Sequence, residues 1–289
     1  MVIIRVTGGL GNQMFQYIYG QALSQKYNQE VAYDLTWYGM SSNHRYRELE
    51  SHEKFRLKSF GIEPRAISQN SSTFFHSKPG KAFNIVANKI FGTGVKPVLP
   101  TYLIGYWLGE QYFKNIWEDV PKIFKLPKIT NKKSLNYKEQ IKDSNAAVSL
   151  HVRMGDYKNY PHLQVCSPAY YKNAVNYLES KLPNAKLFVF SDDIKNAREV
   201  LGKGNDMVFV EDAGSDLDEF QLMAQCNHHV ICNSTFSWWG AWLGEHTNKD
   251  DRLVLAPVRW FNQTDSHAHR KLHDVDRIIP PRWHKIEVD

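Results

Sequence analysis

The sequence has little cysteine and no long apolar run. Only three cysteines, Cys166, Cys226 and Cys232, occur among 289 residues, and no Cys-x-x-Cys pair is present. So small a number of cysteines, and an odd one, argues against a disulfide framework or a zinc ribbon. It is typical of proteins in a reducing compartment. No run of about 18 apolar residues occurs, so we expect no membrane-spanning helix.

Signatures of secretion and of metal binding are also missing. The N-terminal stretch MVIIRVTGGLGNQ turns to glycine after seven residues, too soon for the apolar region of a secretory signal, so we expect a cytoplasmic protein. No His-Glu-x-x-His motif occurs. His267, His269 and His273 lie close together, but no nearby cysteine or carboxylate completes a convincing set. We therefore expect no metal site.

What the chain does contain is an ordinary globular composition with a basic surplus. Hydrophobic residues make up 42% of the chain and charged residues 23%, and the formal net charge is +6. The length suits two domains of about 140 residues each. A basic balance favours anionic partners such as phosphorylated substrates, nucleic acid or anionic membranes. The surplus is modest, so a solvated basic surface without a specific partner is an equal alternative.

The pattern of apolar residues predicts an α/β protein with parallel sheets. Residues 2–6 and 30–34 have the character of strands, and 12–27 between them that of a helix, which gives a βαβ opening. Residues 101–113 have the character of a strand that leads into a helix over 114–126. After a lysine-rich stretch near residue 140, strands and helices alternate as in a doubly wound domain, with Ser167 and Ser215 as expected helix caps and a last strand at 252–257. We place the domain boundary there, giving domains 1–140 and 141–289.

The segment around residues 78–96 carries lysines beside a short apolar helix. Lys78, Lys81, Lys89 and Lys96 surround this helix, which could lie on a membrane surface or on a partner. An ordinary solvated helix is the plainer interpretation.

Polar residues gather after four expected strands of the second half. Because parallel strands end at one edge of a sheet, these residues should face a common ligand site. The four groups are His151, Arg153, Gly155 and Asp156; Ser191, Asp192 and Asp193; Glu211 and Asp212; and residues 233–237.

Several of these residues suit a nucleotide diphosphate. A guanidinium such as that of Arg153 binds phosphate oxygens in bidentate fashion, and NSTFSWW, which starts at Asn233, places hydroxyls at the start of a helix, where anions bind. Asp192, Asp193, Asp218 or Glu219 could accept hydrogen bonds from guanine or ribose. For each residue alone, a helix cap or a surface ion pair is the plainer interpretation.

The N-terminal TGGLGNQM gives an alternative function. It follows a strand and opens a helix, and Asp34 ends the next strand, as in a dinucleotide-binding unit. However, Met14 stands where the third glycine of that fingerprint should be. An NAD(P)-dependent oxidoreductase is therefore the second interpretation. A non-catalytic binder of nucleotide-sugars, supported by the 13% aromatic content, is the third.

Four motifs occur in an order that carries a family resemblance. They are GGLGNQMFQYIYGQAL, YLIGYWLGEQYF, HVRMGDY and CNHHVICNSTFSWWGAWL. Together they resemble the bacterial α-1,2-fucosyltransferases of glycosyltransferase family eleven. The resemblance implies a GT-B fold, with two Rossmann-like domains, an acceptor-side domain first and a GDP-sugar-binding domain second, and the active site in the cleft between them.

The resemblance also implies the reaction. GDP-β-L-fucose would be the donor, and the 2-hydroxyl of a galactose-terminated glycan would be the acceptor, with inversion at the anomeric carbon. Neither a metal nor a separate cofactor would be needed. The product would serve surface polysaccharide (O-antigen) synthesis. We expect no nucleic-acid partner, and a peripheral contact with the inner face of the membrane is left open. The sequence indicates no oligomeric state.

Roles for single residues follow from the same resemblance. Arg153 would hold the diphosphate, Asp156 would orient Arg153, and His151 would support the ribose or a phosphate. Many relatives carry a second arginine where this chain has Met154, whose side chain would otherwise point into the core. The other expected donor contacts are Asp192, Asp218, Glu219, Asn233, Ser234, Thr235, Phe236, Asn12 and Gln13. Asp156 and Asp34 are candidates for the base, and a dissociative route without a strong base is the alternative.

Overall fold

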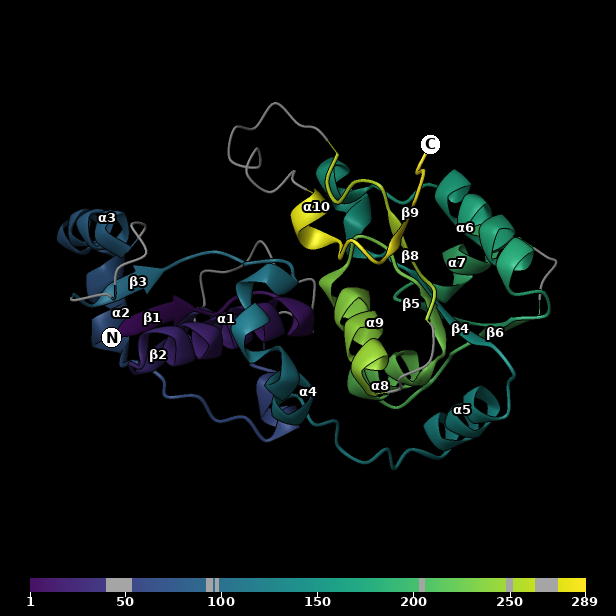
Figure 1. Ribbon diagram of the computed structural model, residues 1–289, viewed down its shortest axis with the longest axis horizontal. Coiled ribbons are helices and arrows are strands. Elements are labelled where there is room, and N and C mark those ends of the chain that lie inside the picture. The colour runs from purple at the N-terminus through teal and green to yellow at the C-terminus, as the bar shows by residue number, and fades with distance from the viewer. Residues whose placement is uncertain (40–53, 92–95, 97–98, 203–205, 248–251, 263–274) are drawn as a thin grey trace. The chain divides into compact units, whose positions relative to one another are not determined.

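The computed structural model describes residues 1–39, 54–91, 96, 99–202, 206–247, 252–262 and 275–289 (Figure 1). The side chains of residues 88–91, 156 and 247 are outside this description, as are His267, His269 and His273. The chain divides into two compact units, Met1–Lys125 and Leu126–Asp289, and each is described by itself. Within the described ranges, no helix has the length and apolar character needed to cross a bilayer.

The division between the units precedes the boundary expected after residue 140. Helix α5 (Lys132–Lys142) contains that expected boundary, and it packs against α8 (Asp216–Gln225) of the second unit. The Ser134 hydroxyl donates a hydrogen bond to the Ala213 carbonyl, which precedes α8. The lysine-rich stretch is therefore a solvated helix of the second unit, and the link between the units comes before it.

The first unit has a parallel sheet in the order β2-β1-β3. Its strands are β1 (Val2–Arg5), β2 (Val31–Asp34) and β3 (Thr101–Leu103). Its α-helices are α1 (Leu10–Tyr27), α2 (Gln69–His76), α3 (Lys78–Phe91) and α4 (Val120–Ile123). Short 3-10 helices cover Thr36–Gly39, Leu57–Phe60, Glu110–Tyr112 and Lys114–Asp119. The βαβ opening that the sequence predicts is confirmed.

The stretch after β3 differs from expectation. The sequence suggests a long strand and then a helix over 114–126, but β3 ends at Leu103 and 3-10 helices follow. Trp107 has a φ of 46° and Gly109 a φ of 108°. These left-handed backbone positions interrupt the strand, because extended residues need negative φ values. Within 114–126, Ile116 has a non-helical backbone (φ −122°, ψ 18°) that divides the stretch into a 3-10 helix and the short α4.

The second unit contains the larger sheet. Its strands are β4 (Ala147–Val152), β5 (Lys186–Ser191), β6 (Met207–Phe209), β7 (His228–Val230), β8 (Val254–Pro257) and β9 (His284–Ile286). Besides α5 and α8 its α-helices are α6 (Pro168–Lys181), α7 (Ile194–Leu201), α9 (Thr235–Thr247) and α10 (Val275–Ile278). Two 3-10 helices cover Asp156–Asn159 and Pro161–Leu163.

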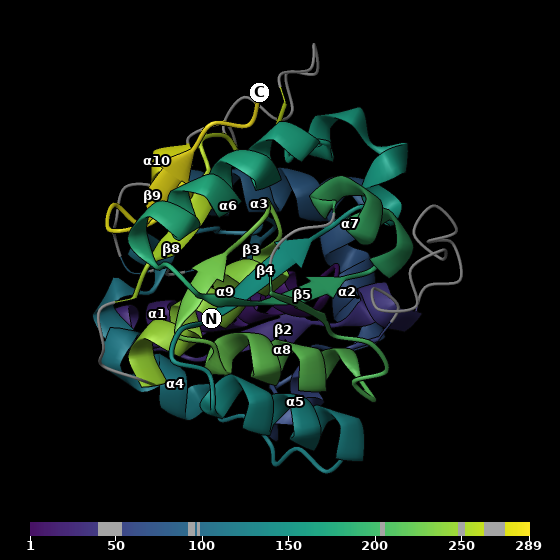
Figure 2. The ribbon, with the colours of Figure 1, turned by 90° about the vertical axis from the view of Figure 1, so that its right-hand side faces the viewer.

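All strand pairs of the second sheet are parallel, in the order β6-β5-β4-β7-β8-β9. Helices α6 and α7 lie on one face and α5 and α8 on the other (Figure 2). The expected caps are confirmed, because the Ser167 and Ser215 hydroxyls accept hydrogen bonds from the first turns of α6 and α8. One prediction is wrong: β8 is followed by a further strand, β9, whose short sequence HKI has no clear strand pattern.

Strand β4 is buried on both faces, which fixes the centre of this unit. Val148, Leu150 and Val152 face the core beneath α6, together with Tyr170 and Leu178. Ala147 faces the opposite core, where Phe188 and Leu222 pack. A strand covered by helices on both faces carries a continuous apolar run. The polar residues that follow Val152 are therefore held at a fixed place at the carboxyl end of the sheet.

Candidate functional site

The order of strands in the second sheet marks one ligand-binding position. From β4 the chain continues to β5 and β6 on one side, and then crosses to β7, β8 and β9 on the other. In open parallel sheets, ligands bind beyond the carboxyl ends of the strands, where the direction of winding reverses. Here that position lies between the ends of β4 and β7. His151 and Arg153 come from β4, and residues 232–236 come from the segment after β7.

Arg153 is held at this position by Asp192. The Nε of Arg153 lies 3.1 Å from Oδ2 of Asp192, and both side chains are about one-fifth exposed, at 19% and 23%. The guanidinium also lies over the ring of Tyr157, 5.6 Å from its centre. A half-buried cation with a fixed carboxylate partner and an aromatic neighbour is well suited to bind an anion.

The loop after β4 is shaped around Asp192. Its Oδ1 accepts hydrogen bonds from the backbone N–H groups of Met154 at 2.9 Å and Gly155 at 3.1 Å. A Cβ atom on Gly155 would lie 2.6 Å from Oδ2 of Asp192, so a side chain there would displace this carboxylate from its present position. Met154 packs, partly buried, against the core beneath α6. Its position is therefore explained by packing.

His151 connects the two strand ends. It is 5% exposed, and its Nδ1 lies 3.2 Å from Sγ of Cys232. Its ring centre is 5.9 Å from that of Phe236. Burial, helped by the nearby Arg153 charge, lowers the pKa of His151 to about 4 although Asp192 opposes this. The imidazole is therefore neutral near pH 7, and only Arg153 of this pair brings a positive charge.

The segment after β7 leads into the N-terminus of α9, but its residues have different roles. The amide of Asn233 is used within the protein, because Nδ2 donates to the carbonyls of Leu163 at 3.0 Å and Trp260 at 3.1 Å. The Ser234 hydroxyl accepts a hydrogen bond from the N–H of Phe236 at 3.3 Å. Thr235 and Phe236 are half-buried at the first turn. Asn233 thus positions the loop, and the helix start supplies the anion-binding dipole.

Glu219, on α8, faces the same region. Burial and the charges of Asp216 and Asp192 raise the pKa of Glu219 to about 7. A buried carboxyl group whose pKa is strongly raised by neighbouring carboxylates, one of them the Asp192 that pairs with Arg153, is a marker of functional sites. The neighbouring Asp218 contributes its backbone N–H to the Ser215 cap.

Two features of this site were not anticipated from the residues. The resemblance assigned the orientation of Arg153 to Asp156, whose side chain lies outside the described part of the chain; the ion pair that the structure describes is with Asp192. Tyr157 was not predicted at all. Its hydroxyl donates to the Asn233 carbonyl at 3.1 Å, so it connects the β4 and β7 loops. Tyr157 is the last residue of the HVRMGDY motif, and this position could have marked it as a site residue.

The glycine-rich loop of the first unit leads into α1, and Gln13 is buried there. Gly8 has a φ of 78°, which allows the turn into α1. Gln13 is 0% exposed, and its amide donates to the carbonyls of Gly8 and Lys54 while its Oε1 accepts from the Arg56 N–H at 2.8 Å. Gln13 therefore holds the segment at residues 54–56 within the first unit, and its amide is unsuited to the donor contact expected of it. Asn12 is half-exposed.

Asp34, the other candidate base, is enclosed at the carboxyl end of β2. It is 1% exposed and accepts hydrogen bonds from the hydroxyls of Tyr102 at 2.5 Å, Ser72 at 2.7 Å and Thr36 at 2.7 Å. Burial opposes ionisation, but these hydrogen bonds outweigh it and lower the pKa of Asp34. A carboxylate so stabilised and enclosed is a poor proton acceptor.

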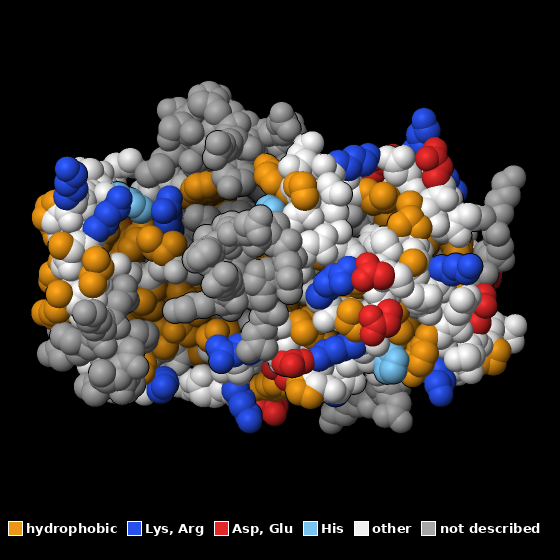
Figure 3. All heavy atoms as spheres, turned by 90° about the horizontal axis from the view of Figure 1, so that it is seen from above, with side chains coloured by type: hydrophobic (Ala, Val, Ile, Leu, Met, Phe, Trp, Pro, Cys, Tyr) orange, Lys and Arg blue, Asp and Glu red, His pale blue; other side chains and the backbone are white. Residues whose placement is uncertain are grey.

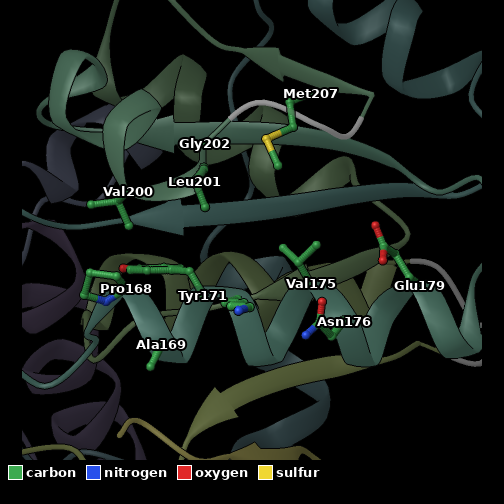
Figure 4. A pocket seen from close by; sticks show the side chains of 11 residues that line it. Pro168, Ala169, Tyr171, Val175, Asn176, Glu179, Val200, Leu201, Gly202 and Met207 are labelled. Carbon is green, nitrogen blue, oxygen red and sulfur yellow. The ribbon is translucent and has the colours of Figure 1, made fainter.

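A separate hollow lies on the α6 side of the second sheet. It has a volume of about 500 Å³ and lies between α6, the end of α7 and the start of β6 (Figure 4). Val175, Val200 and Met207 line it together with Asn176 and Glu179. None of the residues from the β4 and β7 ends lines it, so it is distinct from the candidate site.

Comparison with known proteins places the chain in a family. The family described as Glycosyl transferase family 11 matches residues 1–287. An alpha-1,2-colitosyltransferase of Escherichia coli is 34% identical over 99% of both chains. The O-antigen biosynthesis glycosyltransferase WbnK of Escherichia coli is 30% identical over 89% of this chain and 93% of its own.

A solved structure shows the fold. The fucosyltransferase NodZ from Bradyrhizobium superposes with a TM-score of 0.50 at 14% identity, covering 83% of this chain and 90% of its own. This likeness confirms the expected GT-B-like architecture of α/β units with parallel sheets. It carries no information about the substrate.

Proposed function

The chain belongs to glycosyl transferase family 11, and we propose that it moves L-fucose from GDP-β-L-fucose to the 2-hydroxyl of a terminal galactoside. The linkage formed is α-1,2, and the product serves surface polysaccharide synthesis. The observation that carries this proposal is the Arg153–Asp192 pair beside the N-terminus of α9, at the switch point of the second sheet.

The donor diphosphate fits the charges at this position. Arg153 would contact the phosphates, while its ion pair with Asp192 and its position over Tyr157 fix the guanidinium. The N-terminus of α9 adds backbone N–H groups for the same anion. Glu219 would accept hydrogen bonds from guanine, which requires its ionised form. Neutral His151 would then donate or accept a single hydrogen bond at the ribose or a phosphate.

In the proposed reaction, the acceptor oxygen forms a bond to the anomeric carbon as the bond from that carbon to the β-phosphate oxygen breaks, and the acceptor hydroxyl releases its proton to water or to a phosphate oxygen of the leaving GDP. The electron pair leaves with the diphosphate, and attack from the opposite face inverts the centre from β to α. Arg153 stabilises the growing negative charge of the leaving GDP, so a metal ion is not required for this task. Because Asp34 is enclosed, we favour a dissociative route in which leaving-group stabilisation supplies most of the rate.

A second candidate donor follows from one of the relatives. The 34% identical protein is named as a colitosyltransferase, and colitose is the 3-deoxy counterpart of L-fucose. The choice depends on whether the site makes a hydrogen bond to the 3-hydroxyl. A site that binds a hydroxyl in this way rejects the analogue without it by roughly 10⁴-fold or more. GDP-colitose is therefore the most informative competitor.

A donor comparison tests this proposal. The purified chain is incubated with GDP-L-fucose or GDP-colitose, with EDTA and with or without a terminal galactoside, and GDP release is measured. We expect release that depends on the acceptor, survives EDTA and is faster with GDP-L-fucose. NMR of the product should show the α-1,2 linkage. Faster release with GDP-colitose would move the assignment to the second donor.

Two other outcomes would point to the remaining alternatives. Tight GDP binding without release in any acceptor mixture would favour a non-catalytic nucleotide-sugar binder. Binding of NAD(P)H in place of GDP would favour the oxidoreductase that the TGGLG loop suggests. Family membership argues against the latter.

A further inference from the structure

Part of the first unit lacks acidic residues entirely. Residues 64–109 contain no aspartate or glutamate, although the chain has 30 of them in 289 residues. The same window contains five cationic residues, Arg65, Lys78, Lys81, Lys89 and Lys96. A surface built from this window carries one sign of charge and has no internal acid to neutralise it.

Helices α2 and α3 give this window its exposed surface. They pack together, and Gly80 permits the contact because a Cβ there would lie 1.9 Å from the Phe74 carbonyl oxygen. Asn84 and Ala87 face inward: Oδ1 of Asn84 accepts a hydrogen bond from the Tyr102 N–H at 2.8 Å, and Ala87 is 2% exposed. These contacts fix α3 to the first unit, so the opposite face of the helix is directed toward solvent.

Large apolar side chains lie on that outward face. Ile85 is 60% exposed, Val86 54% and Phe74 47%, and these are among the most exposed large apolar residues of the described chain. Single exposed apolar residues are common on protein surfaces, but three within one helical pair form a patch. The ring of Phe74 lies 6.4 Å from that of Phe83, which places the patch across the junction of α2 and α3.

Cations accompany these apolar side chains. Lys78 and Lys81 are exposed on α3, and neither has an ion-pair partner among the residues that the structure describes. Lys78 and Lys81 precede Ala82 and Ile85, respectively, by four residues, which puts all four on the same helical stripe. At the left edge of Figure 3, which shows the α3 side of the first unit, blue side chains lie beside a group of orange ones and no red is present. We call Phe74, Lys78, Lys81, Ile85 and Val86 the lysine–apolar face.

We propose that the lysine–apolar face docks on an anionic lipid bilayer. A helix lying in the plane of a bilayer inserts apolar side chains between headgroups, and lysines beside them contact anionic lipid phosphates. The absence of acids from residues 64–109 fits a negatively charged partner along the whole surface. The adjacent exposed apolar residues favour a bilayer over a free polyanion, because a polyanion offers no apolar region to receive them. The inference does not depend on the transferase reaction.

Flotation of the purified chain with vesicles tests this proposal. We expect binding to vesicles of phosphatidylcholine mixed with phosphatidylglycerol, and little binding to phosphatidylcholine alone. Because each lysine near an anionic surface contributes a several-fold gain, the double change Lys78→Glu and Lys81→Glu should weaken binding by at least about 30-fold. High salt should weaken the native chain in the same direction.

Two further variants separate the contributions. Ile85→Gln with Val86→Gln keeps the charge and should weaken binding at low and at high salt alike. Lys172→Glu with Lys195→Glu makes the same charge change at exposed lysines of α6 and α7 in the second unit and should leave binding intact. Unfolding curves establish that each variant is folded. Equal loss in the control pair, equal binding to neutral vesicles, or failure of the native chain to bind would each overturn the proposal.

Discussion

Asp34 and Asp192 occupy equivalent places in the two units but bind different partners, hydroxyl groups for Asp34 and a guanidinium for Asp192. Each follows or ends the second strand of a βαβ unit, at the carboxyl end of a parallel sheet. Asp34 is 1% exposed and surrounded by hydroxyl donors from Tyr102, Ser72 and Thr36. The side chain of Asp192 is 23% exposed and paired with Arg153.

The difference lies in what each carboxylate is bound to. Neutral hydroxyls donate hydrogen bonds to the Asp34 carboxylate within the first unit. The carboxylate thereby joins β2 to α2 and β3. Asp192 instead orients a cation that keeps its own contact with solvent. A histidine accompanies each acid, His76 near Asp34 and His151 near the Arg153–Asp192 pair. In both cases burial is the first cause of a lowered histidine pKa. The same sequence pattern, a strand followed by an aspartate, therefore joins elements within one unit and, in the proposed function, orients the phosphate-binding cation in the other.

The largest expected effect tests the cation in the second unit. Arg153→Gln should lower kcat by roughly 100- to 1,000-fold, or about 3 to 4 kcal/mol, because it removes stabilisation of the leaving diphosphate. Steady-state kinetics with saturating donor measures this. The control is Arg198→Gln, which breaks an exposed pair with Glu211 in the same unit and should leave kcat unchanged. Comparable losses in both variants would contradict the assignment.

The next effect concerns His151 and pH. Its pKa is about 4 in the folded chain, so between about pH 6.5 and pH 4 the unfolded chain takes up a proton that the folded chain does not. The free energy of unfolding should therefore fall as the pH drops through this window, by about 3 kcal/mol from this group. Denaturant titrations of the native chain and His151→Gln at several pH values measure the difference. An identical pH dependence in both would disprove a buried neutral His151.

A smaller effect should follow from Asp34→Asn. The variant leaves hydroxyl donors facing an amide N–H₂, and we expect unfolding to become easier by about 2 kcal/mol. Thermal unfolding measures this, with Asp119→Asn as control because that acid is exposed in a surface pair with Lys122. Activity per folded molecule should be retained. Normal stability with lost activity would instead identify Asp34 as the base and would break the contrast with Asp192.

The smallest effect concerns Glu219. Its pKa is about 7, and guanine binding needs the ionised form, so donor affinity should rise as the pH increases from about 6 to 8. Glu219→Gln should weaken the donor by about tenfold, corresponding to one charged hydrogen bond, and should flatten this pH dependence. Calorimetric titration with GDP measures both, and Asp218→Asn distinguishes the two neighbouring acids. Affinity that falls with rising pH would contradict this role.

Local sequence was enough for most of the architecture. Apolar β-branched runs at residues 2–5 and 147–152, and the serine caps at Ser167 and Ser215, are short-range signals that depend on neighbouring residues alone. The place of Arg153 at a carboxyl edge also follows from them. What they could not provide was β9, whose three residues form a strand because β8 offers an open edge.

The candidate site likewise combines features set by local sequence with features set by contacts between distant segments. The sequence by itself determined which strand ends carry polar groups, since His151, Arg153 and residues 233–236 directly follow apolar runs. Only the tertiary structure decided which of them can meet a ligand. Gln13 and Asn233 form their hydrogen bonds with carbonyls 41 and 70 residues away in the chain, and the Asp192 carboxylate meets the Met154 N–H across 38 residues. Such partners depend on the packing of distant segments, which no local pattern records.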